Sequence, residues 1–199
     1  MMIVAFNWAE GNNNQLTLLM NRENWVHRVI SGASWNENGQ ILIGRSADNG
    51  GTWFGISRGG RVAFLVSAEI LLDYVDPHAG SELYPIDFLE SNRSPQDFAL
   101  HVAQREEIRH NNPVVGWSYS LIVADMTLNS MIHIRKPEKE EPDVIIQPVP
   151  FGVHTLSRYG LDAIEDWDLL VFDVFNEMTA NLGNNPLPYL DEIAGLIYV

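Results

Sequence analysis

Short apolar runs alternate with polar turns along the first third of the chain. Residues 2–8 and 15–20 are rich in Ile, Val, Leu and Phe, and a Gly and three Asn residues separate them. Residues 40–43, 52–57 and 61–67 repeat the pattern, and a turn with two consecutive Gly residues joins the last two runs. Apolar runs of this length between turn-forming residues predict β-strands, and consecutive hairpins predict antiparallel pairing.

The spacing of apolar residues changes to a helical period in the middle of the chain. Residues 81–90 and 94–110 are therefore predicted to be helices. Ser94 is a suitable N-cap for the second helix, and Pro95 fits its first helical position. The expected core-facing residues of this helix are Phe98, Val102 and Ile108, with Arg105, Glu106 and Glu107 on the solvent side.

Strands are predicted again at residues 119–124, 130–134, 144–147 and 152–156, and a closing helix at residues 161–181. Strands, then helices, then strands again indicate an α+β architecture with two sheets and helices packed outside them. No internal repeat or linker divides the chain, so a single domain over residues 1–199 is expected.

Composition narrows the classes of function. The chain has 199 residues, enough for one sizeable core, and a formal net charge of −14, which disfavours a nucleic-acid partner. No apolar run approaches the roughly 20 residues of a transmembrane segment, and the first residues lack the basic region of a secretory signal. The chain contains no Cys, which excludes disulfides, thiolate metal sites and a cysteine nucleophile and suits a cytoplasmic location.

Three polar residues, Asn21, Arg22 and Glu23, directly follow the apolar run 15–20. An Arg beside a carboxylate at a strand end can clamp an anion or orient a reacting group, because its planar fork donates in fixed directions. The alternative is a structural pair between Arg22 and Glu23 that closes the corner of the strand.

The six His residues give no metal-binding signal, since no two lie at ligand spacing with a carboxylate nearby. His154 stands out because it lies in the apolar strand 152–156, where its ring must find hydrogen-bond partners. Either a core histidine or a ligand contact would explain it. No Ser lies in a G-x-S-x-G elbow, so a hydrolase triad of that type is not indicated.

Several motifs in order along nearly the whole chain resemble the transport and Golgi organization protein 2 family, also called the NRDE family. The matching segments are Met1-Met2-Ile3, Asn21-Arg22-Glu23-Asn24, Arg28, Trp35, Gly44-Arg45, Gly50-Gly51-Thr52-Trp53-Phe54-Gly55, Phe88-Leu89-Glu90-Ser91, Ser94-Pro95, Leu121-Ile122-Val123-Ala124-Asp125, Gly152-Val153-His154 and Leu156-Ser157.

The resemblance implies a four-layer αββα sandwich like that of N-terminal-nucleophile hydrolases, with antiparallel sheets and helices outside. It also implies roles in Golgi and endoplasmic-reticulum organisation, in protein secretion, and in the handling of lipid or haem. The residues expected to line a ligand pocket are Met2, Asn21, Arg22, Glu23, Arg45 and His154.

Departures from the family pattern fall on polar positions. Met2 stands where the family has Cys, and a thioether cannot be activated as a thiolate is. Expected amide or hydroxyl donors are replaced as well, and losing one oxyanion donor typically costs roughly 100- to 1000-fold in rate. The positions of these donors are Val66-Ser67, Ser120 and Arg158. In the name motif, Glu23 stands where the family has Asp, and Asn24 where it has Glu. The family usually continues with further strands beyond the position of Val199.

We therefore expect a non-catalytic or diverged family member with no catalytic residue, metal or cofactor of its own. Its partner would be a small molecule, such as a lipid or haem, or a secretory-pathway protein, and its location cytoplasmic with Golgi association. One alternative is an amide hydrolase with a replacement nucleophile. Another is a haem or acyl-chain carrier that uses His154 or His27 as a ligand.

Overall fold

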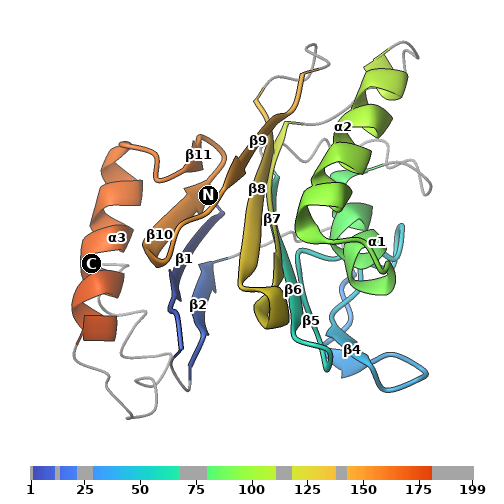
Figure 1. Cartoon of the computed structure of the whole chain (residues 1–199), viewed down its shortest axis with the longest axis horizontal. Coiled ribbons are helices and arrows are strands. Elements are labelled where there is room, and N and C mark those ends of the chain that lie inside the picture. Colours follow the sequence, from blue (N-terminus) through green and yellow to red (C-terminus); the bar gives the residue numbers. More distant parts are fainter. Residues whose placement is uncertain are drawn as a thin grey trace. The chain divides into compact units, whose positions relative to one another are not determined.

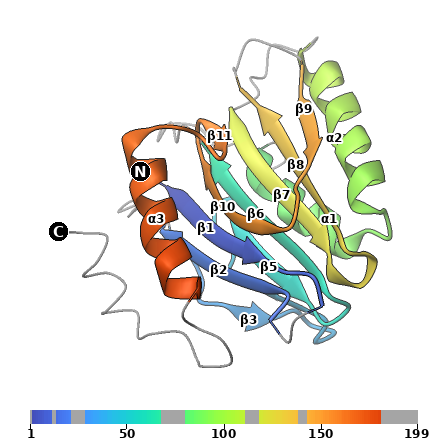
Figure 2. The same ribbon diagram turned by 60° about the vertical axis from the view of Figure 1, so that its left-hand side comes forward.

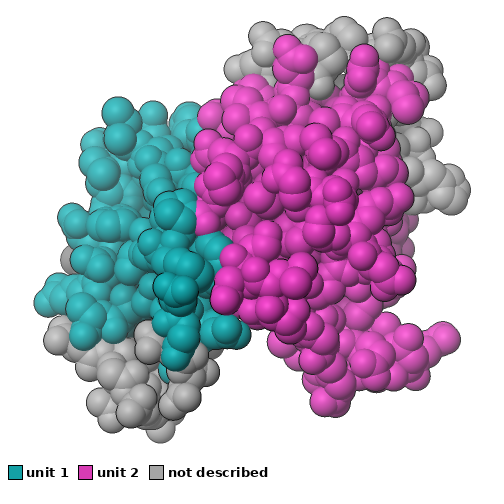
Figure 3. Space-filling view, viewed as in Figure 1, with its two compact units in different colours: residues 1–22, 150–199 teal, residues 23–149 magenta. Residues whose placement is uncertain are grey.

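The described residues of the chain gather into two compact units (Figure 3). Unit 1 comprises residues 1–22 and 150–199, and unit 2 comprises residues 23–149. The computed structural model describes residues 2–11, 14–21, 29–67, 80–110, 118–137 and 143–180. The single domain over residues 1–199 stays a prediction.

Unit 1 is built on a four-stranded antiparallel sheet of order β11-β10-β1-β2 (Figure 1). Its strands are β1 (Ile3–Trp8), β2 (Leu16–Asn21), β10 (Gly152–Ser157) and β11 (Gly160–Leu161). β1 pairs with a strand on each side, and Val4, Ala5 and Phe6 on it are fully buried. The apolar run at the start of the chain is therefore the centre of this sheet.

Helix α3 (Asp166–Ala180) packs on one face of that sheet (Figure 2). Val171 and Phe175 of the helix form a buried cluster with Ile3 and Ala5 of β1. The predicted closing helix began at residue 161, which is wrong, because Leu161 pairs with Leu156 in β11. Antiparallel pairing with β10 across a short hairpin decided the conformation of Leu161, and its local helical spacing did not.

Unit 2 is built on a seven-stranded sheet whose strand order follows the chain, β3 to β9, with every pair antiparallel. The strands are β3 (Ser34–Trp35), β4 (Ile41–Ile43), β5 (Phe54–Ser57), β6 (Arg61–Ser67), β7 (Tyr119–Asp125), β8 (Ser130–Lys136) and β9 (Ile145–Pro148). The predicted antiparallel meander is confirmed. The two-residue strands β3 and β11 were not predicted.

Helices cover one face of the seven-stranded sheet (Figures 1 and 2). α1 packs on β5 and β6, and α2 packs on β7 and β8. The helical segments of the unit are η1 (Ser81–Leu83), α1 (Tyr84–Glu90), α2 (Pro95–His110) and η2 (Met126–Leu128). The predicted start of α2 is confirmed, because the Ser94 hydroxyl accepts from the Asp97 backbone N–H at 3.1 Å and donates to its carboxylate at 2.7 Å.

The predicted core face of α2 is wrong at its C-terminal end. Ile108 is 70% exposed, whereas Glu106 is buried. Glu106 continues the spacing of four residues from Phe98 and Val102, so it lies on their face of the helix. There its carboxylate accepts from Lys136 Nζ of β8 at 2.7 Å and from the Tyr84 hydroxyl. The buried charge is tolerated because a cation and a hydroxyl, which come from β8 and α1, satisfy the carboxylate.

Among the described residues, unit 1 is thus an antiparallel sheet with one helix packed against it, and unit 2 is an antiparallel sheet covered by α1 and α2. In the part of the chain that the structure describes, two sheets of four and seven strands and three α-helices confirm the α+β class and are consistent with an αββα sandwich.

Candidate functional site

Met2 lies directly before the central strand of unit 1, and its side chain is only 4% exposed. The chain therefore buries a thioether at the position where the family resemblance places a nucleophile. A thioether is a weak acceptor with no proton to give up, so it packs as an apolar group and does not attack a substrate.

Asn21 ends β2, and its Cα lies opposite that of Ile3 in the register. Side chains of directly paired residues share a face of the sheet, so Asn21 lies on the face that α3 covers through Ile3. Its predicted neighbours Arg22 and Glu23 lie outside the described residues, as do Asn24 and His27. The prediction that the Asn21-Arg22-Glu23 corner lines a pocket stays a prediction.

His154 lies in β10 opposite Phe6, with the two ring centroids 5.2 Å apart. Its Nδ1 lies 2.8 Å from Asp162 Oδ2, and its Nε2 lies 2.9 Å from the Pro150 carbonyl oxygen. Both of these oxygens accept hydrogen bonds, so the doubly protonated ring satisfies both contacts. Burial lowers the pKa of His154, but the hydrogen bond and charge of Asp162 and the Pro150 carbonyl outweigh burial and raise it.

This arrangement gives His154 a structural task in unit 1. The Asp162 carboxylate also accepts from the Thr155 backbone N–H at 3.0 Å. His154 and Asp162 together fasten the β10–β11 hairpin to the chain just before β10. A haem iron needs a nitrogen lone pair, so His154 could bind it only by giving up one of its two present hydrogen bonds.

A second buried ionisable group in unit 1 is Asp168, in the first turn of α3. Burial raises the pKa of Asp168, although the nearby hydroxyl of Ser157 acts in the opposite direction. Ser157 is fully buried as well, and it lies opposite Ile3 in β10. This pair lies in the packed interior of unit 1, so it offers no open surface to a substrate.

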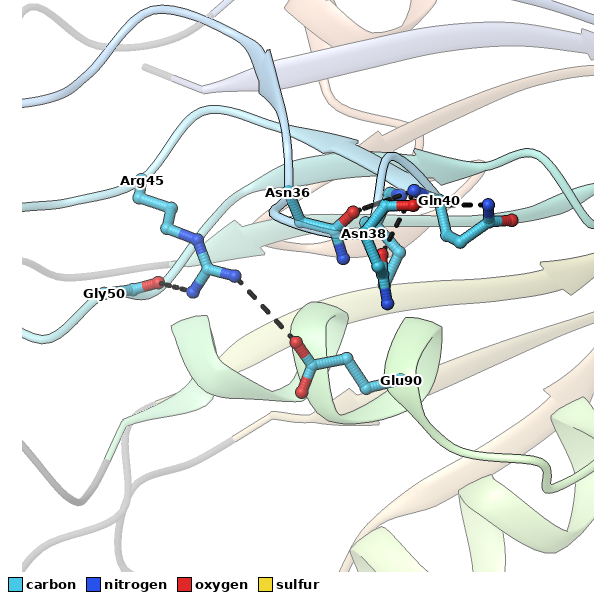
Figure 4. Close-up of polar contacts among 7 residues, drawn as sticks. Asn36, Asn38, Gln40, Arg45, Gly50 and Glu90 are labelled. Atoms are coloured by element: carbon cyan, nitrogen blue, oxygen red, sulfur yellow. Dashed lines mark hydrogen bonds and ion pairs between the residues drawn. The ribbon is translucent and has the colours of Figure 1, made fainter.

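Arg45 belongs to unit 2, and its described contacts lie within that unit. One guanidinium nitrogen donates to the Gly50 carbonyl at 3.3 Å, and another lies 3.9 Å from a carboxylate oxygen of Glu90 (Figure 4). The two side chains are 43% and 55% exposed. At 3.9 Å this ion pair is too long for a direct hydrogen bond, so both groups keep hydrogen-bonding capacity for another molecule.

Arg45 and Glu90 line a polar trough between the β3–β4 hairpin and the C-terminal end of α1. The trough consists of two clefts of about 470 and 380 Å³ that share Asn36, Asn38 and Glu90. Other residues that line the clefts are Ser34, Trp35, Glu37, Gln40, Ile41, Ile43, Ser57, Gly59, Arg61, Leu89, Ser91 and Asn92. Of the predicted pocket residues that the structure describes, Arg45 lines these clefts, whereas Met2, Asn21 and His154 do not.

The carboxamides of the hairpin have fixed orientations. Asn36 Oδ1 accepts from the backbone N–H groups of Gln40 and Ile41 at 2.8 and 3.0 Å, and Asn38 Oδ1 accepts from Gln40 N–H at 3.2 Å. Sequence reasoning passed over Asn36 and Asn38, because Asn residues before a Gly are typical of turns in general. Only the position of α1 across from the hairpin shows that these turn residues line a cavity.

Two further structural findings concern the described part of the chain. Within it, no group of three or more His, Asp or Glu side chains could hold a metal ion. None of the helices described has the length and apolar character needed to cross a bilayer.

The described residues define an α+β protein of two antiparallel sheets, one covered by α3 and the other by α1 and α2, with a partly open polar site at the edge of the larger sheet. The sequence profile of the family described as Transport and Golgi organisation 2 matches residues 1–180. The chain belongs to this family. A comparison with curated proteins finds no match.

Proposed function

We propose that this chain acts by binding and not by turnover, in Golgi or endoplasmic-reticulum organisation, protein secretion or the trafficking of a small molecule such as a lipid or haem. The proposal includes a cytoplasmic location with Golgi association. Family membership supports it, because the family's description names transport and Golgi organisation.

The observation that carries the proposal is the buried thioether of Met2. It occupies the place of the expected nucleophile, and it has neither an ionisable proton nor an open surface. The hydroxyl of Ser157, on the strand next to β1, is fully buried beside Asp168 and is no substitute. The position of the expected nucleophile is therefore packed into the core, whereas catalysis would require a substrate to reach it.

An assay of the purified full chain against activated amide and thioester substrates tests this proposal. We expect wild-type protein and the Met2→Leu variant to show the same rate as buffer, because Leu replaces Met with little change in volume. Turnover that survives Met2→Leu but disappears in Arg22→Ala would reveal a replacement nucleophile. The chain would then be an amide hydrolase.

Binding of small molecules is tested separately, by titration with haemin and with a fluorescent fatty acid. If the chain carries haem, a saturable Soret shift is expected that His154→Gln leaves unchanged, because both His154 nitrogens are already engaged. Loss of the shift in His154→Gln, with the fold intact, would show that His154 is the ligand. Absence of saturable binding for both probes would leave a secretory-pathway protein as the proposed partner.

A cellular test addresses the transport role. In cells depleted of a family member, the chain and its Met2→Leu variant are expected to restore secretion of a reporter protein equally. Failure of both to restore secretion, at normal expression levels, would contradict a role in the secretory pathway.

A further inference from the structure

Helix α3 of unit 1 carries large apolar side chains that remain exposed. Trp167, Leu169 and Leu170 are 46%, 48% and 44% exposed, and all three lie within about one helical turn. Isolated apolar residues are common on protein surfaces, but a cluster of this kind marks a surface that another molecule covers. Figure 2 shows the helix lying across β10 and β1, the strands on which it packs.

Three stripes of side chains run along this helix with one spacing, because residues three and then four positions apart share a face. The first is buried against the sheet, the second is apolar, and the third is exposed with two carboxylates. Each stripe begins one position before the previous one, so successive stripes are about 100° apart around the helix. The buried stripe is Asp168, Val171 and Phe175, the flank stripe is Trp167, Leu170 and Val174, and the outer stripe is Asp166, Leu169 and Asp173.

The charge of the outer stripe is purely negative. A carboxylate in the first turn, such as Asp166, is favoured by the helix dipole, but Asp173 lies in the middle of α3, where that explanation does not apply. No Lys, Arg or His occurs in residues 159–199. The helix and the residues that follow it in the chain therefore supply no cation to these carboxylates.

This combination of charge and apolar surface selects among possible occupants. Residues 181–199 contain Asp191 and Glu192 and no cation, so their charge does not complement the outer stripe. A second copy of α3 would bring the same carboxylates together, which is unfavourable. An anionic lipid surface is repelled in the same way. A helix that carries an apolar stripe beside a basic one complements both the flank stripe and the outer stripe.

We propose that α3 docks a basic amphipathic helix of a partner protein. Trp167 and Val174 are seven positions apart, as are Asp166 and Asp173, so a partner helix with a heptad pattern would meet both stripes in one register. Its apolar residues at positions a and d would pack on the flank stripe, and its Lys or Arg residues at e and g would pair with the outer stripe. Trp167 is expected to be the main anchor, because Trp is enriched among the residues that dominate binding energy.

This proposal goes beyond the function proposed above. It concerns a surface of α3 that takes no part in the position of Met2 or in the contacts of His154. It holds whether or not the partner belongs to the secretory pathway, and its test does not depend on the rescue of secretion.

The test is a titration of a labelled synthetic peptide with the purified full chain, followed by fluorescence anisotropy at about 150 mM salt. The peptide is three heptads long, with Leu at a and d, Lys at e and g, and Ala elsewhere. We expect saturable binding with a Kd below about 100 μM. Two control peptides, one with Glu in place of Lys and one with Ser in place of Leu, should bind at least about tenfold more weakly.

Two variants test the apolar contact. Trp167→Ala is expected to weaken binding of the Lys peptide at least about tenfold, and Leu170→Ala several-fold. Leu100→Ala is the matched control, because Leu100 is 50% exposed on α2 of unit 2, and it should leave the affinity unchanged. Thermal melting checks that each variant folds, and Leu170→Ala keeps the test decisive if Trp167→Ala does not fold.

A pair of charge variants tests the outer stripe. The double variant Asp166→Asn and Asp173→Asn should weaken binding several-fold and make the affinity less sensitive to salt. The matched control is the double variant Glu10→Gln and Asp143→Asn, which removes two exposed charges outside α3 and should have little effect.

Four results would overturn the proposal. The first is no saturable binding of the Lys peptide by the wild-type chain. The second is equal binding of either control peptide, which would show that charge or apolar surface alone is responsible. The third is binding that the folded variants of both stripes retain. The fourth is self-association, or binding to neutral phosphatidylcholine vesicles, that Leu170→Ala abolishes, because the occupant of α3 would then be a second copy or a lipid surface.

Discussion

Replacing Asp162 with Asn isolates the charge that acts on His154. Asp162 has a positive φ of 53°, a conformation that Asn tolerates well, and an Asn oxygen can still accept from the Thr155 backbone N–H. In the Asp162→Asn variant, the new amide nitrogen is then the group that faces His154 Nδ1. Since two donors cannot share a hydrogen bond, His154 must become neutral, with its proton on Nε2 and directed to the Pro150 carbonyl.

The expected loss of stability follows from the loss of the charged hydrogen bond between His154 and Asp162. A hydrogen bond between charged groups contributes roughly 1.5–3 kcal/mol. The Asp162 side chain is 46% exposed, so solvent screening reduces this value, and we expect a loss of about 1 kcal/mol in the free energy of unfolding at pH 6.

The pH dependence provides the sharper test. The pKa of His154 is raised by folding, so the stabilisation is fully present below the unfolded pKa of about 6.5 and is lost as the pH rises through the folded pKa. The stability difference between wild type and Asp162→Asn should therefore be largest near pH 6 and shrink towards pH 9. Denaturant titrations at pH 6, 7.5 and 9 measure it, and NMR titration of the His154 ring measures the pKa directly.

Asp173→Asn is the control, because it removes the same charge from an exposed position on α3. It should change stability little at any of these pH values. The reasoning would be refuted by a stability difference for Asp162→Asn that is equal at pH 6 and pH 9. A His154 ring that titrates below about 6.5 in the wild-type protein would refute it as well.

Three other substitutions test the packing. Lys136→Met leaves the buried Glu106 carboxylate without its cation, so a loss of roughly 3–5 kcal/mol is expected in denaturant titration, and a loss near zero would contradict the buried pair. Burial raises the pKa of Asp168, so the folded protein loses stability as the pH rises through that pKa and the buried carboxyl becomes charged. Asp168→Asn should therefore increase the free energy of unfolding by on the order of 1 kcal/mol at pH 7 and leave it unchanged near pH 3. A decrease in the free energy of unfolding at pH 7 would show that the carboxylate stabilises the fold. A Cβ at Gly55 would lie 2.4 Å from Ile43 Cγ2, so Gly55→Ala should lower stability by about 1–3 kcal/mol, and an unchanged melting temperature would show that the site relaxes freely.

Local signals in the sequence were sufficient for most of the secondary structure. The start of α2 was predictable because its cap involves only Ser94, Pro95 and Asp97, which are neighbours in the chain. The hairpin between β5 and β6 was predictable because its turn residues and flanking apolar runs are contiguous. Such features depend on backbone preferences and short-range hydrogen bonds, which the sequence displays directly.

The candidate site was less predictable, because its groups come from distant segments. Asn36 and Glu90 lie 54 positions apart in the numbering, yet they line the same cleft. Glu106 was expected on the surface, because no residue near it in the chain indicates that it pairs with Lys136. That distant ion pair is what makes its burial tolerable. The sequence indicated that the His154 ring needs hydrogen-bond partners, but it did not indicate that Asp162 and Pro150 supply them.

The sequence by itself determined the α+β class, the family and the loss of the thiol at position 2, since these depend on residue types, local periodicity and motif order. Tertiary structure alone decided which residues share a sheet edge, which charges are buried with a partner and which turn side chains face a cavity. The physical reason is that burial and electrostatic pairing are properties of groups that meet only after folding, whereas propensities and turns act between neighbours along the chain.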